Sequence, residues 1–225
     1  MKKITLLCIV IAITTSSFII SDIANKTDIQ ETSTLEKIAN AHGFQNWDNV
    51  SEIKFTFNVD RDTTHFERSW IWETDHNDIT AITADKTLRY NWSNMDSTAY
   101  KTNGSFINDK YWLLTPYQLI WDSDNISHTH HVSSTAPISK KTMQKLTIVY
   151  GSEGGYTPGD AYDFYFGDDY IIKEWVFRKG NQPQPSMTTT FEDYREISGL
   201  KIPTMHKNAE GSFKLYFTGL DVKTK

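Results

Sequence analysis

Histidines stand close together at one place in the chain, in the run His128-Thr129-His130-His131. His128 and His130 would point to the same side of a strand, and two imidazoles at this spacing can bind zinc. A catalytic zinc site needs three protein ligands and an open position, and no motif links a third ligand to this pair. We therefore predict a solvated loop here, with no metal and no cofactor.

Motifs of covalent catalysis and phosphate binding are missing from the sequence. No serine stands in a Gly-x-Ser-x-Gly motif, and the glycine-rich run at 151–155 lacks the Lys-Ser/Thr pair of a phosphate-binding loop. Asp and Glu are plentiful, but carboxylates without known geometry do not specify a reaction. We predict that the protein is not an enzyme, and a hydrolase acting through carboxylates or the histidine run is the least favoured alternative.

Aromatic residues are the most distinctive chemical feature. Seven Trp, eleven Tyr and twelve Phe are more than one compact core usually needs. Ligand pockets are concave and mostly apolar, and they occur in the mouths of curved sheets. The candidate ligand-binding residues are Trp70, Trp72, Trp112, Trp121, Trp175 and Phe177. The alternative is that the same side chains simply fill the interior.

Two cations share a strand face with these aromatics. Arg68 has the parity of Trp70 and Trp72, and Lys173 has the parity of Trp175 and Phe177. A cation on an apolar face is costly unless it pairs or reaches water. An anionic headgroup at a wet cavity mouth would satisfy each of them, and so would an edge of the sheet, which we favour.

The elements that would position these residues are mainly short strands. Residues 53–59 alternate apolar and polar side chains, and the last third, from 160 to 217, reads as an antiparallel meander. Ser33 and Glu36 form a capping box for an N-terminal helix that Gly43 ends. Residues 106–122 have helical spacing and predict two short helices, with Thr115 as N-cap and Pro116 as first residue of the second. The predicted class is α+β, with a large antiparallel sheet and a helical interruption in mid-chain.

The first residues have the pattern of a secretory signal peptide. Lys2 and Lys3 precede an apolar run at 4–13, and small polar residues follow. We predict a signal peptide at 1–24, a flexible tether at 25–32 and a single domain at 33–225, exported to the periplasm or cell envelope. An uncleaved anchor at 4–20 is the alternative.

Composition excludes other classes. The net charge is −5 and no block of Lys and Arg occurs after the signal peptide, so we predict no nucleic-acid partner. Cys8 is the only cysteine and lies in the predicted signal peptide, so the mature domain would contain no disulfide. We expect a monomer.

Three stretches resemble the bacterial LolA-like superfamily of outer-membrane lipoprotein-sorting proteins, or lipoprotein carriers. These stretches are residues 109–118, 158–163 and 188–203. The resemblance implies a strongly curved, unclosed barrel whose concave aromatic face accepts acyl chains beneath a lid of short helices. On this chain the lid would be residues 106–121.

The first functional hypothesis is therefore an exported carrier-type protein that binds a lipid, an acyl chain or another hydrophobic molecule in an aromatic cavity. Its further partner would be an envelope membrane or a lipoprotein. The alternative is a non-catalytic structural or interaction module of the cell envelope, in which the aromatics form a filled core. The size of the cavity distinguishes the two hypotheses.

Overall fold

The computed structural model describes residues 32–225, which pack as one unit. The predicted signal peptide and all but the last residue of the predicted tether lie outside the described residues. The helices of the unit are α1 (Thr34–Ala41) and α2 (Ser97–Trp121), with 3-10 turns η1 (Phe44–Asn49), η2 (Ser123–Asn125) and η3 (Lys179–Asn181). Among the described residues, no helix is long and apolar enough to cross a bilayer.

A six-stranded antiparallel sheet follows from the alternating sequences near both ends of the unit. Its strand order is β12-β13-β1-β2-β3-β4. The strands are β1 (Val50–Arg61), β2 (Thr64–Glu73), β3 (Asp78–Ile82), β4 (Thr87–Asn91), β12 (Met205–Lys207) and β13 (Phe213–Thr224). Phe55 pairs with Trp70 and Ile53 with Trp72, so the predicted apolar parity of β1 and β2 is brought onto one face.

A second antiparallel sheet has five strands in the order β5-β6-β7-β8-β9, and a small hairpin joins it to the first sheet along the chain. The five strands are β5 (Ile126–Thr135), β6 (Thr142–Tyr150), β7 (Ala161–Phe166), β8 (Ile172–Arg178) and β9 (Met187–Thr190), and the hairpin is β10 (Arg195–Ile197) with β11 (Leu200–Ile202). Within residues 32–225 neither large sheet closes on itself. The predicted α+β class with open antiparallel sheet is therefore confirmed, with the strands divided among three sheets.

The predicted N-terminal helix is also confirmed. Ser33 and Glu36 form both hydrogen bonds of the capping box, and Leu35, Ile38 and Ala39 are buried. Gly43 ends the helix at φ 89°, the left-handed conformation that glycine adopts most readily. At this point α1 touches the β10–β11 turn so closely that a Cβ on Gly43 would lie 2.0 Å from the carbonyl oxygen of Gly199.

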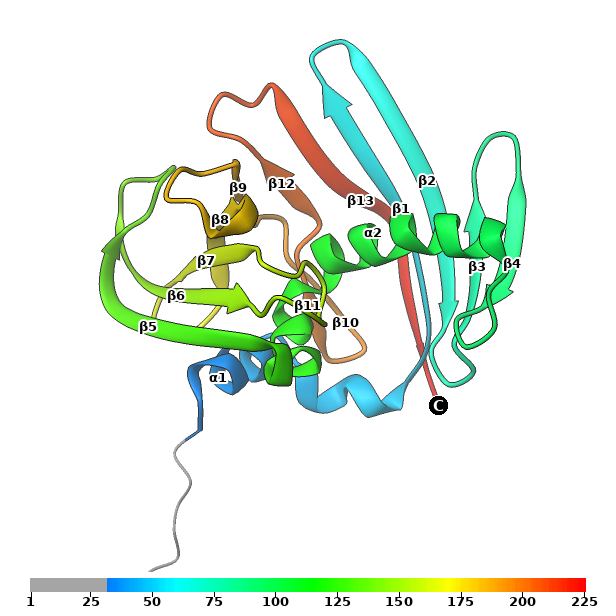
Figure 1. The fold of residues 1–225 in the computed structure, drawn as a ribbon, viewed down its shortest axis with the longest axis horizontal. Helices are drawn as coiled ribbons and strands as arrows, with labels where there is room; N and C mark the ends of the chain where they lie inside the picture. Colours follow the sequence, from blue (N-terminus) through cyan, green and yellow to red (C-terminus); the bar gives the residue numbers. More distant parts are fainter. Residues whose placement is uncertain (1–31) are drawn as a thin grey trace, which may run out of the picture. The chain divides into compact units, whose positions relative to one another are not determined.

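The mid-chain helix differs from its prediction in extent. It begins at Ser97, capped by the Asp96 side chain, nine residues before the predicted start. The predicted interruption is present, since Leu114 has non-helical φ and ψ just before Pro116. The prediction of Thr115 as an N-cap was wrong, because its hydroxyl donates back to the Tyr111 carbonyl inside the helix. Figure 1 shows α2 lying across the six-stranded sheet and then turning down toward α1.

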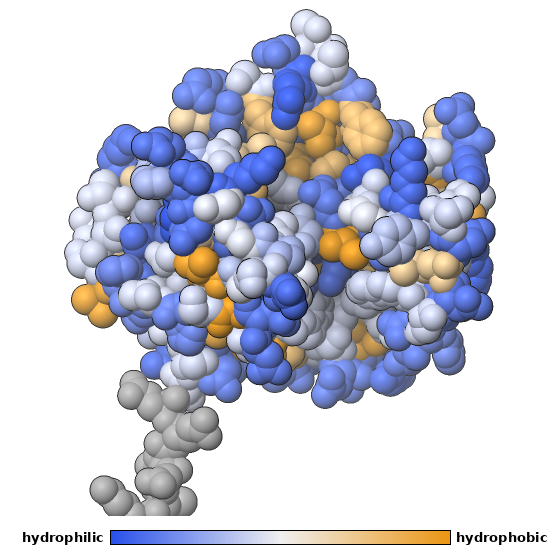
Figure 2. Space-filling model, in the orientation of Figure 1, coloured by the Kyte–Doolittle hydropathy of each residue, from blue (hydrophilic) through white to orange (hydrophobic). Residues whose placement is uncertain are grey.

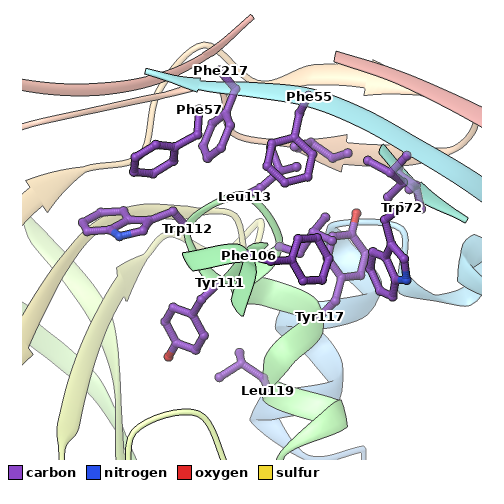
Figure 3. Packing of buried hydrophobic residues seen from close by; sticks show 14 of the residues in the cluster. Phe55, Phe57, Trp72, Phe106, Tyr111, Trp112, Leu113, Tyr117, Leu119 and Phe217 are labelled. Atoms are coloured by element: carbon purple, nitrogen blue, oxygen red, sulfur yellow. The ribbon is translucent and has the colours of Figure 1, made fainter. Parts of the chain in front are cut away.

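The core lies where α2 meets the two sheets. Phe55, Phe57 and Phe217 point from the six-stranded sheet toward Phe106, Leu113 and Tyr117 of α2 (Figure 3). All of these side chains are buried. Close packing of these large side chains holds α2 in one position. The two sides of the helix then face different parts of the fold.

Candidate functional site

An ion pair fixes the first half of α2 to the six-stranded sheet. Asp109 of α2 is fully buried, and both of its oxygens accept from Arg68 of β2, at 2.5 Å from Nε and 2.6 Å from Nη2. The indole N–H of Trp70 donates to the same carboxylate at 2.8 Å. Burial raises the pKa of Asp109, and the Arg68 guanidinium opposes that shift. The pair places Asp109 on the side of α2 that faces β2.

An apolar pocket of about 370 Å³ lies on one side of α2. We call it the apolar pocket. Its walls are Phe57 and Val59 of β1, Phe213 and Leu215 of β13, Trp175 and Phe177 of β8, and Trp112 of α2. Figure 2 shows a recessed apolar area with hydrophilic side chains around it, in the region where β1, β2 and β13 rise above α2. A pocket of this size and lining suits part of an apolar molecule.

A second pocket, of about 480 Å³, lies on the other side of α2. We call it the lysine pocket, because Lys110 is the cation in its wall. Four indoles line it, from Trp47 of η1, Trp72 of β2, Trp92 after β4 and Trp121 at the end of α2. Ile107, Gln118 and Asp122 complete the α2 side. The apolar pocket also has a cation in its lining, Arg61, but Arg61 is exposed, whereas Lys110 is buried.

Helical periodicity explains why the pockets are separate. Asn108 and Trp112 are four residues apart and line the apolar pocket, whereas Ile107 and Lys110 are three apart and line the lysine pocket. Figure 3 shows Trp112 and Trp72 on opposite sides of α2.

Tyr156 lines both pockets. It lies in the glycine-rich loop between β6 and β7, and its ring stacks on Tyr111 with centroids 3.8 Å apart. Its hydroxyl donates to the Asn108 side chain, and its backbone N–H donates to Asp122. The predicted turn at 157–160 positions this loop, with a hydrogen bond from the Asp160 N–H to the Thr157 carbonyl and with Gly159 at φ 82°.

The six predicted ligand-binding residues are divided by the structure. Trp112, Trp175 and Phe177 line the apolar pocket, and Trp72 and Trp121 line the lysine pocket. Trp70 lines neither, because it is buried against Phe106 and Asp109. The five residues that line a pocket therefore remain candidates for ligand binding. Trp70 instead packs against α2.

The two cations singled out in the sequence have different surroundings. Lys173 is 41% exposed and pairs with Asp169 at a sheet turn, as expected for a solvated position. Arg68 is not at a wet cavity mouth or a free edge, since Asp109 satisfies it from inside the fold. Its guanidinium also lies over the rings of Phe57, Phe66 and Trp70.

The histidine run forms part of strand β5 and not a loop. The ring of His130 stacks near Phe166, and its Nε2 lies 2.9 Å from the side-chain oxygen of Gln144 on β6. Among residues 32–225, no three His, Cys, Asp or Glu side chains gather in a group that could hold a metal ion.

Sequence reasoning missed Lys110, Trp47, Trp92 and the pairing of Arg68 with Asp109. A signal for Lys110 was present, because it is a charged residue within an apolar stretch of 106–121. Trp47 and Trp92 come from a turn and from the end of an edge strand, and only the completed sheet brings them beside α2.

No protein-family model matches the chain, and no curated protein is significantly similar to it. Solved structures that it resembles include a DUF1329 family protein from Desulfovibrio piger, with 12% identity, 85% of this chain and 94% of that chain covered, and a TM-score of 0.48. A LolA superfamily protein from Nitrosomonas europaea has 10% identity, with 85% and 93% covered and a TM-score of 0.49. A protein domain from Vibrio parahaemolyticus described as outer membrane lipoprotein-sorting has 9% identity, with 84% and 94% covered and a TM-score of 0.45.

Two of these three structures are described by names of the superfamily that the sequence resembles, and the third as a DUF1329 family protein. The likeness is distant and concerns the fold. The protein is an open antiparallel α+β protein with two aromatic-walled pockets beside a long, interrupted helix.

Proposed function

We propose that the protein binds a hydrophobic molecule, such as an acyl chain, in the apolar pocket beside Trp112. The observation that carries the proposal is the lining of this pocket, in which aliphatic and aromatic side chains from β1, β8, β13 and α2 surround about 370 Å³. A core that its own side chains fill leaves few voids larger than a water molecule. Space of this size in a mostly apolar wall favours a binding protein over a filled structural module.

The test compares two matched valine replacements. Val59 lines the pocket, and Val132 is 79% exposed on β5. Val59→Phe should fill part of the pocket and weaken binding of an uncharged apolar fluorescent probe, N-phenyl-1-naphthylamine, by about tenfold or more, since an occupied site excludes the probe. Val132→Phe should leave binding as in the wild type. Wild-type protein that binds no apolar probe, or equal binding by both variants, would favour the structural module instead.

We further propose that the protein acts at the cell envelope after export, with a membrane or a lipoprotein as donor or acceptor of its cargo. The basic and apolar pattern at the start of the sequence supports export. Cell fractionation with sequencing of the mature N-terminus tests this part, and full-length protein in the cytoplasm would contradict it.

A further inference from the structure

The lysine pocket holds a buried cation that forms no salt bridge with a carboxylate of the described residues. Lys110 is 6% exposed, and its ammonium lies 4.8 Å from the ring centre of Trp121, 5.5 Å from that of Trp92 and 5.8 Å from that of Trp72. Indole faces attract cations, but they replace only part of the hydration that an ammonium loses on burial. Burial accordingly lowers the pKa of Lys110 to about 8, with the charge of Asp122 opposing the shift.

The hydrogen bonds of the ammonium are also incomplete. It has three N–H donors, and among residues 32–225 it has one acceptor, the side-chain oxygen of Gln118 at 3.0 Å. No carboxylate of the described residues forms a salt bridge with it. Asp122 lines the same pocket, but its Oδ2 already accepts from the Tyr150 hydroxyl and from the Tyr156 backbone N–H.

The ammonium of Lys110 therefore has two N–H donors without an acceptor among the described residues. A charged group of this kind beside a pocket of about 480 Å³ favours a ligand that carries an acceptor and negative charge.

We propose that the lysine pocket binds a small amphiphilic monocarboxylate, with its carboxylate on Lys110 Nζ and its hydrocarbon part among the indoles of Trp47, Trp92 and Trp121. The site is on the other side of α2 from the apolar pocket, so it is a further site and does not depend on the proposed function.

The charges of the pocket select one class of ligand. A cation would be the usual guest of an aromatic cage, but here the Lys110 ammonium already occupies that place and would repel it. A doubly charged anion would meet the carboxylate of Asp122. A single carboxylate pairs with Lys110 at the least cost, and the four indoles with Ile107 accept an apolar chain.

The test on the wild-type protein uses three probes of one chain length: octanoate, octanol and octylammonium. Calorimetry and intrinsic tryptophan fluorescence should show octanoate binding at least about tenfold more tightly than the other two, because charge-assisted hydrogen bonds form only with the carboxylate. Octanol that binds as tightly as octanoate, or no binding of octanoate, would overturn the proposal. This comparison needs no variant.

A pair of lysine variants on one helix then locates the site. Lys110→Met keeps the apolar volume and removes the charge, and it should abolish the preference for octanoate over octanol. Lys101→Met, at an exposed position of α2, should retain the full preference. A preference retained by Lys110→Met would overturn the assignment. Val59→Phe should leave octanoate binding unchanged, so that failure of this site and failure of the apolar pocket are separate results.

Discussion

Arg68 and Asp109 form the most deeply buried ion pair described in this protein, with Asp109 fully buried and the Arg68 side chain 19% exposed. Removing one partner of such a pair leaves a charge without compensation inside the fold. We expect Arg68→Met to lower the free energy of unfolding by about 3–5 kcal/mol. Urea denaturation monitored by tryptophan fluorescence measures this loss.

A surface arginine provides the control. Arg89 is 58% exposed and pairs with Glu73 and Asp78, so Arg89→Met should cost less than about 1 kcal/mol. Adding Asp109→Asn to Arg68→Met should recover part of the loss, because the buried charge is then gone. Equal losses in the two arginine variants would show that the buried pair does not stabilise α2.

At the residue scale, the sequence predicted which face of a strand a side chain lies on better than it predicted which residue that side chain contacts. The parity of Arg68 with Trp70 and Trp72 was correct, because it depends on the local period of a strand. The partner of Arg68 lies 41 residues further along the chain, on a helix whose position is set by tertiary packing. The sequence shows Lys110 as a charge within an apolar stretch, but the pocket around it depends on the same tertiary packing and could not be predicted.

At the scale of elements, the contact between the end of α1 and the β10–β11 turn is the most sensitive to side-chain volume. Gly43 has φ 89°, and a Cβ there would lie 2.0 Å from the Gly199 carbonyl oxygen. We expect Gly43→Ala to destabilise the protein by more than about 2 kcal/mol, because the left-handed conformation and the clash both add cost. Thermal unfolding measures the effect.

Gly104 of α2 is the matched position for this substitution. A Cβ on Gly104 would meet nothing within 4 Å, and the residue lies within a helix. Gly104→Ala should therefore stabilise the protein by up to about 1 kcal/mol through helix propensity alone. If the two alanine variants change the midpoint in the same direction, the close contact at Gly43 is not a constraint.

Elements with strong local signals were predictable. The capping box of Ser33 and Glu36 and the alternation in β1 gave α1 and its neighbouring strand with nearly the right bounds. The first half of α2 was missed because residues 97–105 contain Thr, Asn and Gly, which favour helix weakly, and few apolar side chains in helical register. Packing of Ala99 and Phe106 against the sheet gives this half a stability that its propensity does not predict.

At the scale of the whole molecule, two buried histidines should determine how stability depends on pH. Burial lowers the pKa of His42 to about 4 and that of His206 to about 3. An unfolded chain protonates both near pH 6.5, whereas the folded protein keeps them neutral. The stability from this effect is therefore complete above pH 6.5 and falls below it by up to about 1.4 kcal/mol per pH unit for each histidine, until the folded-state pKa is reached.

Urea unfolding between pH 7 and pH 5 measures this slope before most carboxylates titrate. His206→Gln should lower the number of protons that bind on unfolding by about one, because glutamine does not titrate. The slope of the unfolding free energy against pH should then be smaller. A slope that is the same in the wild type and in His206→Gln would contradict the role of His206.

The pairing of β1 with β13 has a consequence for the order in which the molecule forms. Val50 pairs with Thr224 and Arg61 with Phe213, so the first strand of the sheet obtains one of its two neighbours from the last strand of the chain. Pairings between such distant segments slow folding. During synthesis, β1 keeps one edge of backbone donors and acceptors open until residues 213–224 have been made. Strands with open edges pair with other chains, so the chain is exposed to aggregation until β13 takes its place.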